Sequence, residues 1–274
     1  MPDGHVWDTE MAPERAVGPL AGPLTAREAC PTAASIFSRV HGKLWDDEVS
    51  IVKIAEVFHS VQGEGSLLGV PSVFVRTSGC NLRCSWCDTP YTSWNPEGAT
   101  LTVEEVLARV SAYRCGHVVV TGGEPMIAPD IAALTTGLRT LGSHITIETA
   151  GTVYAPVPCD LMSISPKLAN STPEGPWRER HDALRIQPDV LRRLMGEYAH
   201  QLKFVVAAAD DLVEIRAVVE SLRAKAANVI LMPEGIDAAV LRERGRWIAE
   251  ICKREGFRYS PRLHVDLYGN RRGT

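Results

Sequence analysis

From Ile51 onwards, short β-rich runs alternate with amphipathic segments of helical periodicity. Such alternation predicts right-handed βαβ units and a parallel sheet, so we expect an α/β fold. The predicted strands are Ile51–Phe58, Ser72–Thr77, His117–Thr121, His144–Glu148, Leu161–Ser165, Gln201–Val206, Asn228–Met232 and Leu263–Leu267. The predicted helices are Thr102–Tyr113, Asp130–Leu141, Pro188–His200, Asp211–Lys225 and Asp237–Glu255. Thr102 and Glu105 have the spacing of a capping box, which supports a helix start there.

Polar or glycine-rich motifs follow the ends of five predicted strands. They read SGCNLRC, TGGEP, ETAGT, SPK and MPEG. In a (β/α) barrel these positions lie on one face, where active sites are built. The sequence therefore predicts one active site assembled from strand ends.

Length, charge and hydropathy exclude several classes of protein. The 274 residues suit one large α/β domain or two small ones. The net charge of −4 arises within the first 50 residues, so the rest of the chain is electrically balanced and no nucleic-acid partner is expected. No apolar run approaches membrane-spanning length, and no basic N-terminal region precedes an apolar one. We therefore expect a cytoplasmic protein with no membrane partner.

Residues 1–48 differ from the rest of the chain. They are rich in proline, glycine and alanine and show little periodicity. This composition predicts an N-terminal extension, either a poorly ordered tail or a strap over the body. The catalytic domain is expected to cover residues 49–274.

Three of the seven cysteines, Cys80, Cys84 and Cys87, form a C-x₃-C-x₂-C motif. Three closely spaced thiolates can bind three irons of a [4Fe–4S] cluster, which leaves the fourth iron open to another ligand. A zinc knuckle is one alternative, but the nearest fourth ligand, Cys115, lies beyond a predicted helix. Three unrelated buried cysteines are a second alternative, which polar neighbours such as Arg83 disfavour.

The triad, with Trp86 before its last cysteine, resembles the signature of the radical S-adenosylmethionine superfamily. That superfamily also carries a GGE-type motif after the next strand, which here is Gly122, Gly123 and Glu124. The resemblance implies a partial (β/α) barrel, a [4Fe–4S] cluster on the three cysteines, and S-adenosylmethionine as the cofactor whose cleavage releases a 5′-deoxyadenosyl radical.

Motifs outside the triad resemble the 7-carboxy-7-deazaguanine synthase family over roughly residues 51–274. They include FHSVQGEG at 58–65, GVPSVFVRTSGC at 69–80, ISPK at 164–167 and LHVDLYGNRRGT at 263–274. The resemblance implies conversion of 6-carboxy-5,6,7,8-tetrahydropterin to 7-carboxy-7-deazaguanine with release of ammonia, a step of queuosine and deazapurine biosynthesis. It also implies Mg²⁺ in the site, a homodimer and a flavodoxin-like reductant.

The resemblance implies a role for each residue at a matching position. Contacts with the methionine cofactor are implied for Trp86, Cys87, Asp88, Gly122, Gly123, Glu124, Glu148, Ser165, Pro166 and Lys167. Contacts with the pterin substrate are implied for Val61, Gln62, Gly63, Glu64, Arg76, Thr121, His264, Asn270 and Thr274. Thr89 is implied to bind Mg²⁺.

Simple chemistry supports some of these roles and leaves alternatives open. The Arg76 guanidinium could bind the substrate carboxylate bidentately, although an arginine at a strand end can also be a surface residue. The Gln62 amide can match the hydrogen-bond donors and acceptors at the edge of a pterin ring. Alternatively, Gln62 belongs to a polar turn between strands and binds no ligand. Asp88 and Thr89 could cap a helix instead of binding ligands. Arg271 and its neighbour could be a solvated basic end.

Two other functions share part of this pattern. A glycyl-radical activase would have the triad and the GGEP motif, but it would need neither Arg76 nor the QGEG motif. A non-enzymatic iron–sulfur or zinc interaction module would not cleave S-adenosylmethionine. Anaerobic reconstitution of the cluster distinguishes these possibilities.

Overall fold

The computed structural model describes residues 49–274, so the extension predicted for residues 1–48 lies outside the described residues. In the described chain, nine strands form one sheet in the order β3-β1-β2-β4-β5-β6-β7-β8-β9. Their bounds are β1 (Ile51–Val61), β2 (Pro71–Thr77), β3 (Ala99–Thr102), β4 (His117–Gly122), β5 (His144–Thr149), β6 (Leu161–Ile164), β7 (His200–Val206), β8 (Val229–Pro233) and β9 (Arg258–Tyr259). Strands β2 and β4 to β9 run parallel, whereas β1 is antiparallel to both of its neighbours. This α/β arrangement confirms the predicted fold class.

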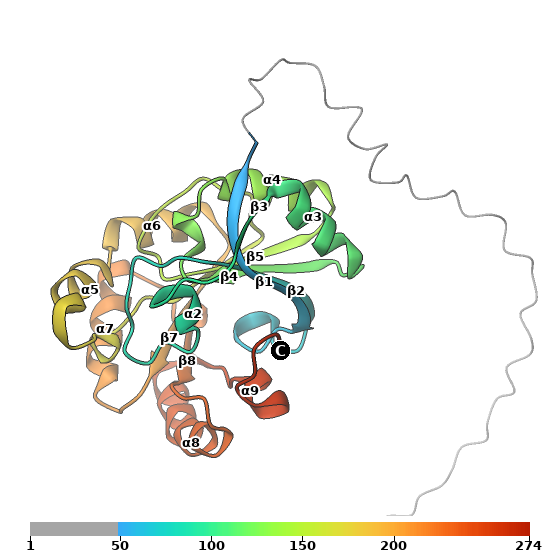
Figure 1. The fold of residues 1–274 in the computed structure, drawn as a ribbon. Coiled ribbons are helices and arrows are strands. Elements are labelled where there is room, and N and C mark those ends of the chain that lie inside the picture. The colour runs from blue at the N-terminus through green and yellow to red at the C-terminus, as the bar shows by residue number, and fades with distance from the viewer. Residues whose placement is uncertain (1–48) are drawn as a thin grey trace, which may run out of the picture. The chain divides into compact units, whose positions relative to one another are not determined.

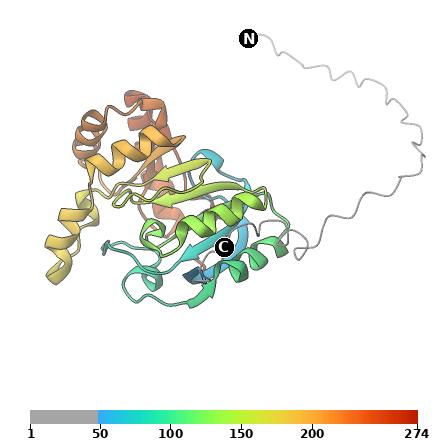
Figure 2. The ribbon, with the colours of Figure 1, turned by 90° about the horizontal axis from the view of Figure 1, so that it is seen from above.

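Helices connect the parallel strands, and one more helix follows the last strand. Their bounds are α2 (Pro90–Ser93), α3 (Val103–Ala112), α4 (Ile131–Thr140), α5 (Arg178–Leu184), α6 (Pro188–Glu197), α7 (Asp211–Leu222), α8 (Ala238–Glu255) and α9 (Leu263–Tyr268). Figures 1 and 2 show α3, α4, α6, α7 and α8 following one another around one face of the sheet. Within residues 49–274, none of the helices combines the length and the hydropathy that a membrane span requires.

The two faces of the sheet have different chemistry because side chains alternate along each strand. One face is apolar and packs against the helices in a single core, as Val75, Val120, Ile147 and Phe204 illustrate. The other face carries polar and charged side chains, and the register places Arg76 on β2 beside Thr121 on β4. The helices therefore cover the outer face and leave the inner face to line a cavity.

Most of the predicted elements are present, with boundaries shifted by a few residues. Strands were predicted at the positions of β1, β2 and β4 to β8, and helices at those of α3, α4, α6, α7 and α8. The capping box is confirmed, since the Thr102 hydroxyl accepts from the Glu105 N–H at 3.2 Å and the Glu105 carboxylate accepts from the Thr102 N–H at 2.8 Å. The short strands β3 and β9 and the short helices α2 and α5 were not predicted.

The strand predicted over Leu263–Leu267 is wrong, because this segment is helix α9. The alternation of apolar residues favoured a strand, but only Val265 is buried and Leu267 is 55% exposed. The N–H groups of Val265 and Asp266 both donate to the carbonyl of Arg262, so the segment satisfies its backbone by local turns. Because only one side chain of this segment is buried, alternating apolar residues do not have to face a core from a strand, and the segment can form a helix.

The topology determines which loops meet at the cavity. Loops that follow β2, β4, β5, β6 and β8 emerge at the same edge because these strands are parallel. The loop over residues 62–70 instead follows the antiparallel strand β1 and lies near the start of β7, where the Ser66 N–H donates to Gln201 Oε1 at 2.9 Å. This loop closes the inner face from the opposite end.

Candidate active site

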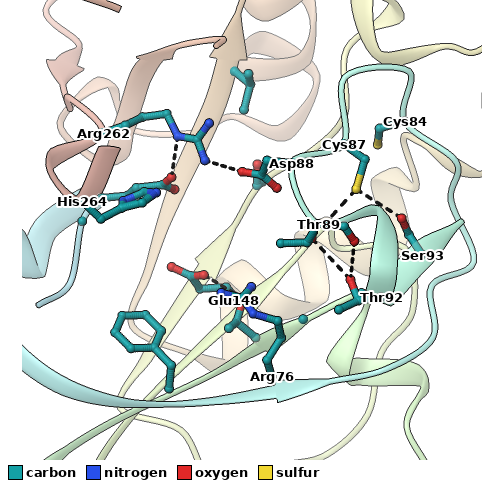
Figure 3. Close-up of a pocket in the computed structure, with 18 of the residues that line it drawn as sticks. Arg76, Cys84, Cys87, Asp88, Thr89, Thr92, Ser93, Glu148, Arg262 and His264 are labelled. Carbon is teal, nitrogen blue, oxygen red and sulfur yellow. Dashed lines mark hydrogen bonds and ion pairs between the residues drawn. The ribbon is translucent and has the colours of Figure 1, made fainter. Parts of the chain in front are cut away.

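A cavity of about 540 Å³ lies against the inner face of the sheet. Its walls come from the inner-face strand residues, the loops after β1 and β2, and the C-terminal tail. Figure 3 shows Cys84 and Cys87 on one side of the cavity and Arg262 on the other. Every residue predicted to bind cofactor, substrate or metal lines this cavity except Glu124 and Pro166. The fold thus brings motifs from distant parts of the sequence into one site.

Cys80, Cys84 and Cys87 lie on the loop between β2 and α2, and all three line the cavity. Burial raises the pKa of Cys80 to about 12 and that of Cys84 to about 11. A bound cation favours the thiolate and reverses this effect. The ionisation of these thiols is therefore expected to follow metal binding.

Cys80, Cys84 and Cys87 belong to one small apolar cluster at the cavity wall. In residues 49–274, no three His, Cys, Asp or Glu side chains are grouped as ligands of a single metal ion. A cubane does not require such convergence, because each cysteine binds a different iron atom. The donor set therefore fits a [4Fe–4S] cluster with one iron left open to the cavity.

Gly122 is the last residue of β4 and Gly123 follows it, and both pack against the backbone that leads into the cysteine loop. A Cβ on Gly122, whose φ is +132°, would lie 2.1 Å from the carbonyl oxygen of Thr77. A Cβ on Gly123 would lie 2.0 Å from the carbonyl oxygen of Gly79. The resemblance implied that both glycines contact the cofactor. The structure shows that glycine is also needed at both positions because the neighbouring backbone leaves no space for a side chain.

Replacing Gly122 with alanine is expected to lower the free energy of unfolding by about 3 kcal/mol, because backbone strain and a clash with Thr77 add together. Gly142→Ala is the matched control, since Gly142 also has a positive φ, of +76°, but a Cβ there meets no atom within 4 Å. This control is expected to cost about 1 kcal/mol. Urea unfolding measures both, and equal losses would contradict the packing argument.

Glu124 lies beneath the cavity and is fully buried. Its carboxylate accepts from the Thr149 hydroxyl at 2.7 Å and from the N–H groups of Ala150 and Met126 at 2.8 and 3.1 Å. Burial raises the pKa of Glu124. These bonds fix the loop after β4 to the end of β5, so Glu124 supports the cavity wall from behind. Pro166 also lies outside the cavity lining.

One wall of the cavity combines an aromatic face, a cation and a hydroxyl group. Lys167 Nζ lies 5.7 Å from the centre of the Trp86 ring and donates to Ser165 Oγ at 2.9 Å. The Trp86 indole N–H donates to the carbonyl of Asn170 at 3.0 Å, which fixes the ring plane. A planar base, a ribose and a carboxylate are groups that such a wall can bind.

Arg76 projects from β2 into the cavity, and its guanidinium lies 5.5 Å from the centre of the Phe58 ring. Its Nε donates to Glu56 Oε1 at 2.7 Å, and the Tyr91 hydroxyl donates to the same oxygen at 2.7 Å. Within residues 49–274, the Nη groups of Arg76 make no hydrogen bond. Glu56 therefore orients a guanidinium whose outer N–H groups can bind a carboxylate.

Glu148 connects two residues predicted to bind substrate. Its Oε1 accepts from Gln62 Nε2 at 3.2 Å and its Oε2 accepts from the Thr121 hydroxyl at 2.8 Å. The Gln62 Oε1 in turn accepts from the Glu64 N–H at 3.2 Å, which fixes the orientation of the amide. Glu148, predicted as a cofactor contact, thus lies among the residues predicted to contact the pterin.

Sequence reasoning missed two cations that complete this side of the cavity. Lys203 and Arg262 both pair with Glu64, and Arg262 also pairs with Asp88. Burial alone would raise the pKa of Glu64, but the two cations lower it well below its usual range. A lysine inside the apolar strand QLKFVV is a signal of a paired buried charge. No local pattern identifies Arg262.

Thr89 and Asp88 do not cap helix α2. Thr89 occupies the N-cap position without a side-chain cap bond, and its hydroxyl accepts from the Thr92 hydroxyl at 3.3 Å. The Thr89 oxygen lies 3.9 Å from Cys87 Sγ, while the Asp88 carboxylate pairs with Arg262. The capping alternative is therefore not observed, and the Thr89 hydroxyl faces the cavity.

The C-terminal tail lies over the cavity and is held by Arg272. This guanidinium lies 4.0 Å from the centre of the Tyr91 ring and pairs with Glu97 at 2.9 Å and Glu56 at 3.5 Å. Asn270 and the last residues of the chain line the cavity beside it. In Figure 1 the C-terminus lies close to α9. Arg272 is therefore paired although its side chain remains 46% exposed, and Arg271 is exposed.

His264 and Gly63, both predicted to contact substrate, are in close contact. A Cβ on Gly63 would lie 1.9 Å from His264 Nδ1. The Leu263 N–H donates to the Gly63 carbonyl at 2.9 Å. The glycine therefore allows α9 to pack against the loop after β1, and it brings the imidazole to the cavity.

Three comparisons describe proteins similar to this chain. The family model of the radical SAM superfamily matches residues 74–218. The 7-carboxy-7-deazaguanine synthase of Halobacterium salinarum is 46% identical over 232 residues, covering 79% of this chain and 90% of that protein. The synthase of Rhodopirellula baltica is 47% identical over 230 residues, covering 82% and 90%. The crystal structure of QueE from Escherichia coli has a TM-score of 0.60 and 24% identity, covering 78% of this chain and 95% of that one, which shows the same fold.

Proposed function

Because this chain belongs to the 7-carboxy-7-deazaguanine synthase family of the radical SAM superfamily, we propose that residues 49–274 form the catalytic domain that carries out that synthesis. The substrate is 6-carboxy-5,6,7,8-tetrahydropterin, and its ring contracts with release of ammonia. The observation that carries this proposal is that three cysteines and a carboxylate-binding arginine, Arg76, face one cavity. Family membership does not favour a glycyl-radical activase or a non-enzymatic module.

Cys80, Cys84 and Cys87 hold the [4Fe–4S] cluster. When bound, the cluster supplies the electron that cleaves S-adenosylmethionine and so generates the 5′-deoxyadenosyl radical. The wall of Trp86 and Lys167 binds the cofactor, because an aromatic face suits adenine and an ammonium group suits the methionyl carboxylate. The backbone after β4 forms the adjoining part of this pocket.

The opposite half of the cavity binds the pterin. Arg76 receives the substrate carboxylate through its outer N–H groups, which Glu56 aims into the cavity. Gln62, held by Glu148, presents its amide to the donor and acceptor edge of the ring. His264 and the C-terminal tail line this half of the cavity.

Thr89 would hold Mg²⁺ through its hydroxyl group. Magnesium prefers oxygen ligands and often shares one with a substrate. The Thr89 hydroxyl lines the cavity and is not used as a helix cap. The substrate carboxylate and water would supply the remaining ligands.

An anaerobic activity assay tests the proposed function directly. The reconstituted protein is expected to bind about four irons per chain and, with dithionite and S-adenosylmethionine, to convert the carboxylated tetrahydropterin to the deazaguanine product. Cleavage of S-adenosylmethionine without product would refute the substrate and retain the radical chemistry. A protein that binds only zinc would refute both.

Arg76→Ala is expected to raise the KM for the pterin about 10- to 100-fold, since a hydrogen-bonded ion pair contributes about 1.5–3 kcal/mol. Iron content and S-adenosylmethionine cleavage without substrate should stay close to those of the unmodified protein. Arg139→Ala is the control, because Arg139 pairs with Asp160 in a partly exposed salt bridge away from the cavity. An unchanged KM for the pterin in the Arg76 variant would show that Arg76 does not bind the substrate.

The cellular setting and partners belong to the same proposal. A reducing compartment, the cytoplasm, suits a protein whose Cys80, Cys84 and Cys87 must stay free thiols to bind iron. The electron donor is a flavodoxin-like protein, and the enzyme works as a homodimer. Sedimentation analysis tests the dimer, and replacement of dithionite by a reduced flavodoxin tests the donor.

A further inference from the structure

The two residues on either side of Cys84 are held by a distant segment of the chain through their backbone N–H groups. The Arg83 N–H donates to His181 Nδ1, on helix α5, at 3.1 Å. The Ser85 N–H donates to the carbonyl oxygen of Ser171 at 2.9 Å. Cys84 is also the most buried of the three cysteines, with 8% of its surface exposed. Its position therefore depends on residues about 90 positions further along the chain.

His181 and Ser171 are coupled to each other beneath the loop, and both are buried. The Ser171 hydroxyl donates to the Leu168 carbonyl at 2.6 Å, so it accepts a hydrogen bond from His181 Nε2 at 2.9 Å. The Nε2 atom then carries the hydrogen, and Nδ1 is free to accept from the Arg83 N–H. Burial lowers the pKa of His181, which favours this neutral form. Every bond in the series thus has one donor and one acceptor.

The direction of an amide N–H matters beside an iron–sulfur cluster. Hydrogen bonds to the sulfur atoms change the reduction potential of a cluster, and a donated N–H stabilises the more negative, reduced state. One amide of this loop already points to a ligand sulfur, since the Leu82 N–H donates to Cys80 Sγ at 3.4 Å. The next amide, that of Arg83, points away to His181.

We propose that His181 and Ser171 are positioning residues that fix the peptides around Cys84 and keep the Arg83 N–H from donating to the cluster. This inference rests on the proposed binding of a cluster by Cys84. The pair acts only through the loop, because neither side chain lines the cavity. Because the Arg83 N–H does not donate to the cluster, the His181–Ser171 pair maintains the low reduction potential that reductive cleavage of S-adenosylmethionine requires.

Hydrogen exchange on the full-length protein without cluster tests the positioning itself. His181→Leu removes the acceptor, so the peptide covering residues 80–87 is expected to exchange about tenfold faster or more. His181→Asn keeps an acceptor oxygen near the position of Nδ1 and is expected to restore most of the protection. Ser171→Ala keeps the carbonyl that binds the Ser85 N–H, so a smaller increase is expected, which provides a second variant if His181→Leu does not fold.

Redox titration and electron paramagnetic resonance on the reconstituted protein test the effect on the cluster. His181→Leu is expected to shift the midpoint potential to more positive values, change the spectrum of the reduced cluster and slow S-adenosylmethionine cleavage. His181→Asn should resemble the unmodified protein. The control is His117→Leu, the same change at the start of β4, away from the loop, which should move neither readout.

Unchanged exchange of residues 80–87 in both His181→Leu and Ser171→Ala would overturn the positioning role. Faster exchange with an unchanged potential and spectrum would overturn the electronic role of the Arg83 amide. A protein with normal exchange behaviour that binds no iron would overturn the proposed function, and the exchange data would still decide whether His181 holds the loop.

Discussion

Cys84→Ala is expected to abolish S-adenosylmethionine cleavage while the protein remains folded. The thiol lines the cavity and would bind one iron of the cluster, so its loss leaves two protein ligands for a [4Fe–4S] core. The cost in folding should be about 1 kcal/mol, because a single sulfur atom at the cavity wall is removed. Iron analysis, visible absorption and detection of 5′-deoxyadenosine after anaerobic reconstitution measure the effect.

Cys252→Ala is the matched control for this variant. Cys252 is also buried, on helix α8, where its thiol faces the carbonyl of Arg258 at 3.4 Å, outside the cavity lining. The control is expected to keep its iron and its cleavage activity. If Cys84→Ala still cleaves S-adenosylmethionine, the assignment of the three cysteines as cluster ligands is wrong. If both variants lose iron, the effect is not specific to the cysteine loop.

Arg262→Leu is expected to lower the free energy of unfolding by about 3 kcal/mol and to weaken pterin binding. The Arg262 side chain is 9% exposed and pairs with both Glu64 and Asp88, which belong to separate loops. Its removal leaves Glu64 with Lys203 as its one remaining ionic partner among the described residues. Most of the loss comes from Glu64, since the Asp88 side chain is 37% exposed and can be solvated.

The control for this charge network is Arg242→Leu. Arg242 on α8 pairs with Asp266 on α9, but their side chains are 67% and 51% exposed. An exposed pair of this kind contributes about 0.5 kcal/mol or less. Urea unfolding compares the two variants, and calorimetric titration with the pterin separates stability from binding. Similar losses in both would show that burial of the Arg262 network does not matter.

The sequence predicted the parallel sheet and its main helices because their signals are local. A helix with a capping box, such as α3, or a strand of consecutive apolar residues, such as β4, carries its pattern within about ten residues. The short elements β3, β9 and α9 carry too few buried side chains for such a pattern. The strands β3 and β9 form by pairing with β1 and β8, which no local pattern shows. The strand predicted for α9 was wrong because this segment satisfies its backbone by local turns.

The sequence by itself also determined the chemistry of the site. The spacing of Cys80, Cys84 and Cys87 indicated a cluster with an open iron, and the motifs around it indicated the family. Only the tertiary structure decided which of the other residues line the cavity, which support its wall and which lie on the substrate side. It places Glu124 behind the cavity wall, groups Glu148 with the substrate side and adds Arg262 and His181, because buried hydrogen bonds and ion pairs join loops that are far apart in the sequence.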